Sequence, residues 1–153
     1  MKRRTLLQGL TLAALMPATL VQAQGSLTVQ VYRHPGCGCC GAWMDHLRAN
    51  GFTVQEHQVN DTGVYRERFK IGEQFASCHT ATVGGYALEG HVPAREIRRI
   101  LKEKPHAIGL AVPGMPMGSP GMEGAYSEAY DVLLIDASGR ARPYAHYPAL
   151  NST

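Results

Sequence analysis

Apolar and polar side chains alternate where the globular part of the chain begins. Residues 27–32 read Leu-Thr-Val-Gln-Val-Tyr, which is the period of two typical of a strand with one buried face. Residues 42–50 instead repeat their apolar side chains at helical spacing and stop before Gly51. Residues 52–59 predict a second strand, and a helical crossover between two strands makes them a parallel pair.

The middle of the chain predicts a hairpin between two helices. A short helix is expected over residues 64–71, and a strand pair over residues 80–89 turns at Gly84-Gly85. A further helix begins at Val92-Pro93 and is closed by Pro105, because the residue before a proline disfavours helical geometry. The resulting order of elements is β-α-β-α-β-β-α.

The last third of the chain predicts more strands around a long loop. Residues 107–112 are an apolar, strand-like run, and residues 113–122 are a loop dense in proline, glycine and methionine. A strand over residues 131–135 and an extended segment over residues 141–147 flank a turn, which predicts a C-terminal β-hairpin. We expect this hairpin to extend the same sheet, so that the fold class is α/β (α+β).

The first residues have the organisation of an export signal. Residues 2–4 are basic, residues 6–21 are mostly apolar but too short and interrupted to span a bilayer stably, and Val21–Ala23 resembles a cleavage site. The pattern predicts a signal peptide over residues 1–23 (the leader) and a single exported, periplasmic domain over residues 24–153. The basic run also resembles a twin-arginine signal, which makes that export route one alternative, and an uncleaved anchor helix is another. No later segment predicts a membrane span.

Charge and composition narrow the classes of function. Three of the fifteen basic residues lie in the leader, and the remaining twelve balance the twelve acidic residues. A neutral domain lacks the basic footprint of a nucleic-acid-binding protein. The acidic residues show no pairing that suggests acid–base hydrolysis, and no glycine-rich phosphate loop stands between a strand and a helix.

Four cysteines carry the candidate chemistry. Cys37, Cys39 and Cys40 lie within four residues, and Cys78 follows much later. Adjacent cysteines rarely bridge each other, because a disulfide needs converging Cβ vectors. A Cys37–Cys40 disulfide would close too short a loop to stabilise the fold much, so its purpose would be redox chemistry. The clustering therefore predicts a metal site or a redox site.

A Cys-x-x-Cys at the start of the first helix, in this order of elements, is similar to the thioredoxin fold. In that fold a proline usually stands just before the third strand and faces the two cysteines. Here the position holds Ser77-Cys78-His79. By analogy of fold, Cys78 is expected beside the other three cysteines. A thiol at the substrate-facing position also weakens the case for an ordinary disulfide oxidoreductase.

Ordered motifs through nearly all of the chain after the leader carry a more specific resemblance. They are Cys37–Gly41 with Trp43, Ser77–Ala81, Val83–Tyr86, Glu89–Pro93, Gly109–Pro116, Gly118–Glu123 and Tyr130–Leu134. Together they resemble the CopG family of bacterial copper-resistance proteins, also called domain of unknown function 411. The resemblance implies a thioredoxin-like fold, a periplasmic location and copper held by the cysteines. It does not define an activity.

The chemistry of the thiolates favours soft metals. Thiolates select Cu(I), zinc or iron–sulfur clusters, and the four cysteines together could form a closed Cys₄ zinc site. Three thiolates crowded on one turn strain tetrahedral ligation of a single ion and bridge readily between metals. The pattern therefore favours a multinuclear Cu(I)–thiolate cluster, and the start of a helix supports it by lowering the thiol pKa. Zinc, and disulfide chemistry without a metal, remain as alternatives.

Histidines and methionines supply further candidate ligands. His79 follows Cys78 and, in a strand, would point to the opposite face, so it is either a ligand or a residue behind the ligands. His34 lies on a turn that can fold over the site, and His91 precedes a helix that it could equally cap. The methionines of the 113–122 loop resemble thioether sites for Cu(I), although methionine also fills gaps in cores; they are Met115, Met117 and Met122.

Two functions of different class are compatible with these residues. The first is a periplasmic copper-resistance protein that sequesters Cu(I), passes it to periplasmic carriers or efflux components, or interconverts Cu(I) and Cu(II). The second is a thiol–disulfide oxidoreductase of thioredoxin type that acts on exported proteins. A structural zinc domain is a third, weaker alternative. Cys37 and Cys40 are the candidate redox pair, so the sequence leaves open whether the protein is an enzyme.

Overall fold

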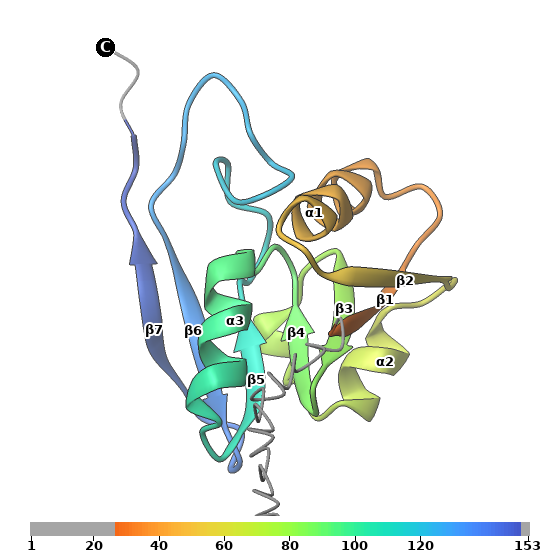
Figure 1. Cartoon of the computed structure of the whole chain (residues 1–153), viewed down its shortest axis with the longest axis vertical. Coiled ribbons are helices and arrows are strands. Elements are labelled where there is room, and N and C mark those ends of the chain that lie inside the picture. Colours follow the sequence, from red (N-terminus) through yellow and green to blue (C-terminus); the bar gives the residue numbers. More distant parts are fainter. Residues whose placement is uncertain (1–26, 151–153) are drawn as a thin grey trace, which may run out of the picture.

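The computed structural model describes residues 27–150 and contains a seven-stranded mixed sheet with helices (Figure 1). The order of elements confirms the thioredoxin-like arrangement and the added C-terminal strands. In chain order they are β1 (Thr28–Arg33), α1 (Gly38–Ala49), β2 (Thr53–Gln58), α2 (Gly63–Arg68), the 3-10 helix η1 (Glu73–Phe75), β3 (His79–Val83), β4 (Tyr86–Glu89), α3 (Ala94–Glu103), β5 (Ala107–Ala111), β6 (Tyr130–Asp136) and β7 (Ala141–Tyr147).

The sheet has the strand order β2-β1-β3-β4-β5-β6-β7. The strands of the two helical crossovers, β1 with β2 and β4 with β5, pair in parallel. The other neighbours pair antiparallel, including the C-terminal β6 and β7. The predicted C-terminal hairpin therefore extends the same sheet instead of forming a separate unit.

Two apolar layers cover the two faces of the sheet. The larger layer packs α1 and α3 on one face, with the fully buried Trp43, Leu47 and Ile97 against alternate strand residues such as Leu88. On the other face, the segment after α2 and the helix η1 contribute Ile71 and Phe75, which pack on Ala87, Ala111 and Ile135. Successive strand residues point to opposite faces, which is why Ala87 and Leu88 belong to different layers.

Two helix boundaries differ from the predicted ones. Helix α1 begins at Gly38 and not at residue 42, so Cys39 and Cys40 belong to its first turn. Helix α2 ends at Arg68 and not at residue 71. Lys70, with φ of 62°, has left-handed backbone geometry that a helix does not continue through.

The strand register gathers distant segments at one edge of the sheet. Arg33 at the end of β1 pairs with His79 at the start of β3, and Thr80 pairs with Glu89 at the end of β4. Glu89 in turn pairs with Ala111 at the end of β5. The segments that follow β1, β4 and β5 therefore leave the sheet beside the segment that enters β3.

The predicted leader, residues 1–23, lies outside the residues that the structure describes. Within residues 27–150, none of the helices has the length and apolar character needed to cross a membrane.

Candidate metal centre

Three of the four cysteines are positioned by the start of α1. Cys37 is the residue just before the helix, and its N–H donates to the carbonyl of His34 at 3.0 Å. Cys37 and Cys40 form a disulfide with their Cα atoms 5.4 Å apart. Cys39 lies between them as a free, half-buried thiol, while Cys40 is fully buried.

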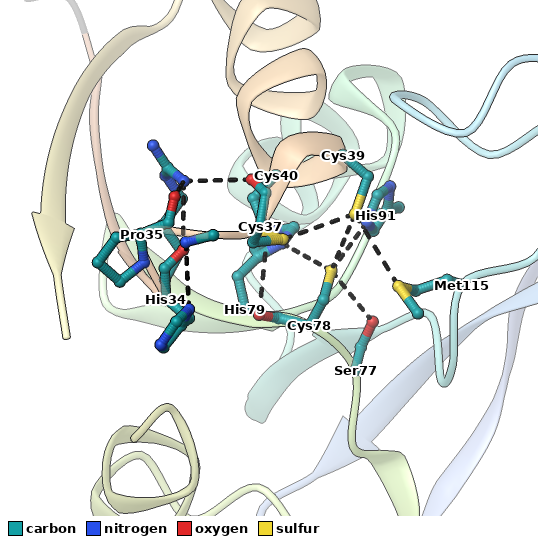
Figure 2. The surroundings of a disulfide bond; sticks show 12 residues. His34, Pro35, Cys37, Cys39, Cys40, Ser77, Cys78, His79, His91 and Met115 are labelled. Carbon is teal, nitrogen blue, oxygen red and sulfur yellow. Dashed lines mark hydrogen bonds between the residues drawn. A yellow bond between two sulfur atoms is a disulfide. The ribbon is translucent and has the colours of Figure 1, made fainter. Parts of the chain in front are cut away.

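Cys78 completes the group, as expected from the fold analogy. Its Sγ lies 3.9 Å from the Sγ of Cys39, which in turn lies 3.5 Å from the Sγ of Cys37 (Figure 2). All four sulfur atoms lie within 4.8 Å of one another. The sulfur atoms are therefore close enough to share metal ions, and two of them, on Cys39 and Cys78, are free thiols.

A buried carboxylate holds the segment that carries Cys78. Glu89 is fully buried and its Oε1 accepts the Ser77 backbone N–H at 2.8 Å and the Arg66 Nε at 3.0 Å. Its Oε2 accepts the Thr80 hydroxyl at 2.6 Å. Donors on both sides of Cys78 thus meet one carboxylate, which fixes the backbone from which the thiol projects.

His79 has a ring nitrogen beside the Cys78 thiol, although in a strand its side chain would point to the opposite face. The prediction assumed that both residues belong to one strand, but β3 begins at His79, so strand alternation does not apply to the pair. The His79 Nδ1 lies 3.3 Å from the Cys78 Sγ, and its ring packs on Trp43 with centroids 4.3 Å apart. Its Nε2 is buried without a hydrogen-bond partner among the described residues.

His91, for which the sequence left ligation and helix capping both open, faces Cys78 in the structure. Its Nε2 lies 3.0 Å from the Cys78 Sγ, and its Nδ1 lies 2.8 Å from the carbonyl oxygen of Pro120. A carbonyl only accepts, so Nδ1 carries the proton and donates it. The Nε2 lone pair of neutral His91 therefore faces Cys78, which is the arrangement of a metal-ligating histidine held by a backbone carbonyl.

The pKa values of this group favour neutral side chains near neutral pH. Burial, and next the nearby His91, lower the pKa of His79 to about 3. Burial also lowers the pKa of His91. Burial, and next the Cys39 sulfur, raise the pKa of Cys78 to about 12. The imidazole lone pairs are thus free for a metal, and the Cys78 thiol has to release its proton when a metal binds.

The methionines and His34 have different positions relative to the cysteines. Met115 is half exposed, and its Sδ lies 3.9 Å from the Cys39 Sγ. Met117 places its terminal methyl over Gly124. Within residues 27–150, Met117 and Met122 have no sulfur–sulfur interaction with a cysteine like the one at Met115. His34 is exposed, and its Nδ1 accepts the Gly36 N–H at 3.1 Å, so it stands outside the group.

The loop after β5 approaches the start of α1 at Gly121. Gly121 has φ of 90°, and a Cβ on it would lie 2.7 Å from the Trp43 nitrogen and 2.8 Å from the Cys39 carbonyl oxygen. Only glycine lets the loop backbone approach the helix this closely. The same loop supplies the Pro120 carbonyl that orients His91.

The donor atoms suit a soft metal in either redox state of the cysteines. With the disulfide formed, Cys78 with His79 and His91 is a group whose ligand atoms all lie within 4.8 Å, and Cys39 adjoins it. With the disulfide reduced, two more thiolates join them. Thiolate and imidazole donors without a carboxylate select Cu(I) or zinc over hard cations.

Comparison with known proteins finds one matching family and two similar solved structures. A family model described as a protein of unknown function, DUF411, matches residues 75–122. Two solved structures, both described as copper resistance protein copG, are 44% identical to the chain. Form 2 covers 80% of this chain and 99% of its own length with a TM-score of 0.77, and form 1 covers 80% and 98% with a TM-score of 0.76. Among curated proteins, no match is found.

Proposed function

The chain belongs to the CopG family of copper-resistance proteins, and we propose that it binds Cu(I) at the cysteine–histidine group after export to the periplasm. The observation that supports this most is the position of Cys78. Its Sγ has the Cys39 sulfur at 3.9 Å, the His79 nitrogen at 3.3 Å and the His91 nitrogen at 3.0 Å. Soft and borderline donors converging on one thiol are what Cu(I) ligation requires.

The proposed capacity for copper depends on the redox state of Cys37 and Cys40. The disulfide form offers two free thiols, and the reduced form offers four. Four crowded thiolates are more ligands than one Cu(I) ion requires, so they can bridge several Cu(I) ions. We therefore propose a thiolate-bridged Cu(I) cluster in the reduced protein and fewer ions in the disulfide form.

The same pair of cysteines can exchange electrons with copper. When the Cys37 and Cys40 thiols form their S–S bond, they release two electrons and two protons. Those electrons reduce two Cu(II) ions to two Cu(I) ions, and the protons pass to water. A Cys-x-x-Cys at a helix N-terminus is an arrangement that poises thiols for such exchange.

A thiol–disulfide oxidoreductase that acts on exported proteins is the second candidate. The Cys37–Cys40 disulfide at the start of α1 favours it. Two features oppose it: Cys78 occupies the position that faces a protein substrate in thioredoxin-like folds, and the loop at Gly121 closely approaches the start of the helix. We propose on this basis that the redox partner is copper, and that Cu(I) then passes to periplasmic carriers or efflux components.

Metal titration in both redox states tests the binding proposal. Protein expressed from the full chain and purified without chelators would be titrated anaerobically with Cu(I) against a coloured chelator, before and after reduction. We expect more Cu(I) per chain after reduction, and a large loss of affinity in Cys78→Ser in both states. At a thousandfold excess over Kd, Cu(I) should raise the free energy of unfolding by about 4 kcal/mol. An unchanged unfolding midpoint with saturating Cu(I) would rule out a specific site.

Addition of Cu(II) to reduced, metal-free protein tests the redox step. We expect Cu(I) and loss of thiols to appear together, with two thiols consumed for each two copper ions. Cys40→Ser should abolish the fast phase and keep some copper binding through the other three cysteines. If that variant reduces Cu(II) as fast as the wild type, the Cys37–Cys40 pair is not the electron source. Oxidation of a reduced protein substrate without any copper would favour the oxidoreductase.

A further inference from the structure

The solvent exposure of the residues decreases along a line of sulfur and nitrogen atoms that runs from the surface into the site. Met115 is 50% exposed, Cys39 and Cys78 are half buried, and His91 is fully buried. Neighbouring members of this line lie 3.9 Å apart from Met115 Sδ to Cys39 Sγ, 3.9 Å from Cys39 to Cys78, and 3.0 Å from Cys78 to the His91 Nε2 (Figure 2). Each step is short enough for one ion to contact both atoms.

Met115 is held beside the cysteines and does not extend freely from its loop. The N–H of Gly114, the residue before it, donates to the Ala76 carbonyl at 3.0 Å. The Ser77 hydroxyl donates to the Gly114 carbonyl. Both bonds tie the loop to the segment that carries Cys78, so the distance between the thioether and the thiols is set by the fold.

The exposure of Met115 argues against a role as a core residue. A methionine that fills a gap in a core is buried on all sides. Met117, two residues along the same loop, folds its methyl over Gly124 and has no sulfur–sulfur interaction with a cysteine within the described chain. The two methionines can therefore be compared directly, because the thioether of Met115 approaches the thiols and the thioether of Met117 does not.

We infer that Met115 is the residue that first takes Cu(I) from an external ligand and hands it to Cys39, an inference that rests on the proposed copper function. A thioether is soft, so it suits Cu(I), and it is neutral, so it binds without releasing a proton. Cu(I) exchanges its external ligand for the Met115 sulfur, and a bond to Cys39 forms as the thiol proton passes to water. The bond to Met115 then breaks while Cys78 binds the ion and releases its own proton. The oxidation state of copper does not change.

A residue that transfers the ion and does not hold it affects rates more than affinity. Such a ligand speeds loading and unloading together, because both directions cross the same transition state. We expect Met115→Leu to slow both rates by about tenfold, which is ~1.4 kcal/mol. The Kd for Cu(I) should stay within about threefold of the wild-type value, a shift below ~0.7 kcal/mol.

The experiment uses the full-length chain as expressed and purified, reduced and free of metal. It is mixed anaerobically by stopped flow with the coloured Cu(I)–bicinchoninate complex, and the loss of colour gives the loading rate. Excess bicinchoninate added to loaded protein gives the unloading rate. Met115→Leu and Met115→Gln both remove the sulfur atom, but the first side chain is apolar and the second is polar. An effect shared by both variants reports loss of a ligand, whereas an effect of Met115→Gln alone reports loss of an apolar contact with the chelator. Met117→Leu is the matched control and should load at the wild-type rate.

Each outcome has a defined meaning. Slower loading and unloading in both Met115 variants, with Kd kept, supports the inference. A weaker Kd with unchanged loading and faster unloading would make Met115 a resting ligand and overturn it, as would wild-type rates in both variants. Equal slowing in Met117→Leu would assign the effect to the loop and also overturn it. Wild-type protein that takes no Cu(I) from the complex would refute the proposed function together with this inference.

Discussion

Cys39 and Cys78 lie 3.9 Å apart, yet different kinds of structure hold the two thiols. Cys39 belongs to the first turn of α1, where helical backbone bonds place it between Cys37 and Cys40, its neighbours in sequence. Cys78 stands between elements, on a segment held by Glu89 and faced by His91. The helix side of the site is a local structure, while the Cys78 side depends on contacts between distant parts of the chain.

The Cys78 side should collapse when its buried carboxylate is removed. Glu89→Ala leaves the Ser77 N–H and the Thr80 hydroxyl without their acceptor, and it removes the buried one of the two carboxylates that pair with Arg66. We expect a loss of about 3–5 kcal/mol in the free energy of unfolding, measured by chemical denaturation, because two buried donors lose their acceptor and Arg66 loses its buried partner. Cu(I) affinity should fall with it, while the Cys37–Cys40 disulfide still forms in the chains that remain folded.

Asp45→Ala is the matched control for this change. Asp45 pairs with Arg48 on the exposed face of α1, at 2.8 Å. An exposed pair contributes little, so the change should stay within about 1 kcal/mol. If Glu89→Ala is as mild as Asp45→Ala, the carboxylate does not support the Cys78 segment and the contrast between the two sides fails.

Acid should destabilise the metal-free protein through the histidines beside Cys78. The pKa of His79 is about 3 in the folded protein against an ordinary 6.5, so between these values the unfolded chain binds more protons. Stability therefore falls as the pH falls through this window, and His91 adds to the loss in the same direction. We expect a loss on the order of 3 kcal/mol between about pH 7 and about pH 4, followed by denaturant unfolding at each pH.

Replacement of single histidines shows which of them causes the loss of stability in acid. His79→Gln should flatten the dependence of stability on pH in this range, whatever its effect on absolute stability. His34→Gln, on the helix side and exposed, should keep the wild-type slope. Equal slopes in the wild type and in His79→Gln would show that the burial of His79 does not set the acid response.

A smaller effect is expected where the two sides of the site touch. Gly121→Ala adds a Cβ that meets the backbone of α1 at Cys39 and Trp43, in a residue with positive φ. Gly139→Ala has the same backbone conformation but open space around it, so it measures the conformational strain alone, about 1 kcal/mol. We expect Gly121→Ala to cost about 2 kcal/mol, and to weaken Cu(I) binding because the Pro120 carbonyl shifts from His91. Equal losses in the two variants would show that the loop can move without strain.

The contrast between the two sides also explains what the sequence could predict. The cysteines at 37–40 and their helix are visible as a short motif beside an apolar period. The fourth cysteine needed an analogy of fold, because its partners lie 38 and 39 residues away. The position of His91 beside Cys78 follows from the register of the sheet. The sequence holds one sign of it: His91 follows the strand that ends at Glu89, so it leaves the sheet at the edge where Cys78 enters.

Other features were beyond any pattern in the chain. Glu89 reads as an ordinary polar residue at a strand end, and only the fold shows that its side chain is fully buried with Arg66. The difference in role between Met115 and Met117 depends on which thioether the loop turns toward Cys39. The predicted start of α1 lies later than Gly38 because two glycines and two cysteines, which are weak helix formers, occupy residues 38–41. The helix is stabilised instead by the packing of Trp43 and Leu47.

The spacing of these groups along the chain also decides when each of them can meet during folding. Cys37 and Cys40 are three residues apart, so an unfolded chain can bring them together at a small entropy of loop closure. Cys39 meets Cys78 only across 39 residues, and Met115 only across 76. Contacts between residues so far apart in sequence form late in folding. In an oxidising compartment the nearby pair therefore closes first and leaves the distant thiols unpaired. The proposed copper site is then complete only in chains that have finished folding.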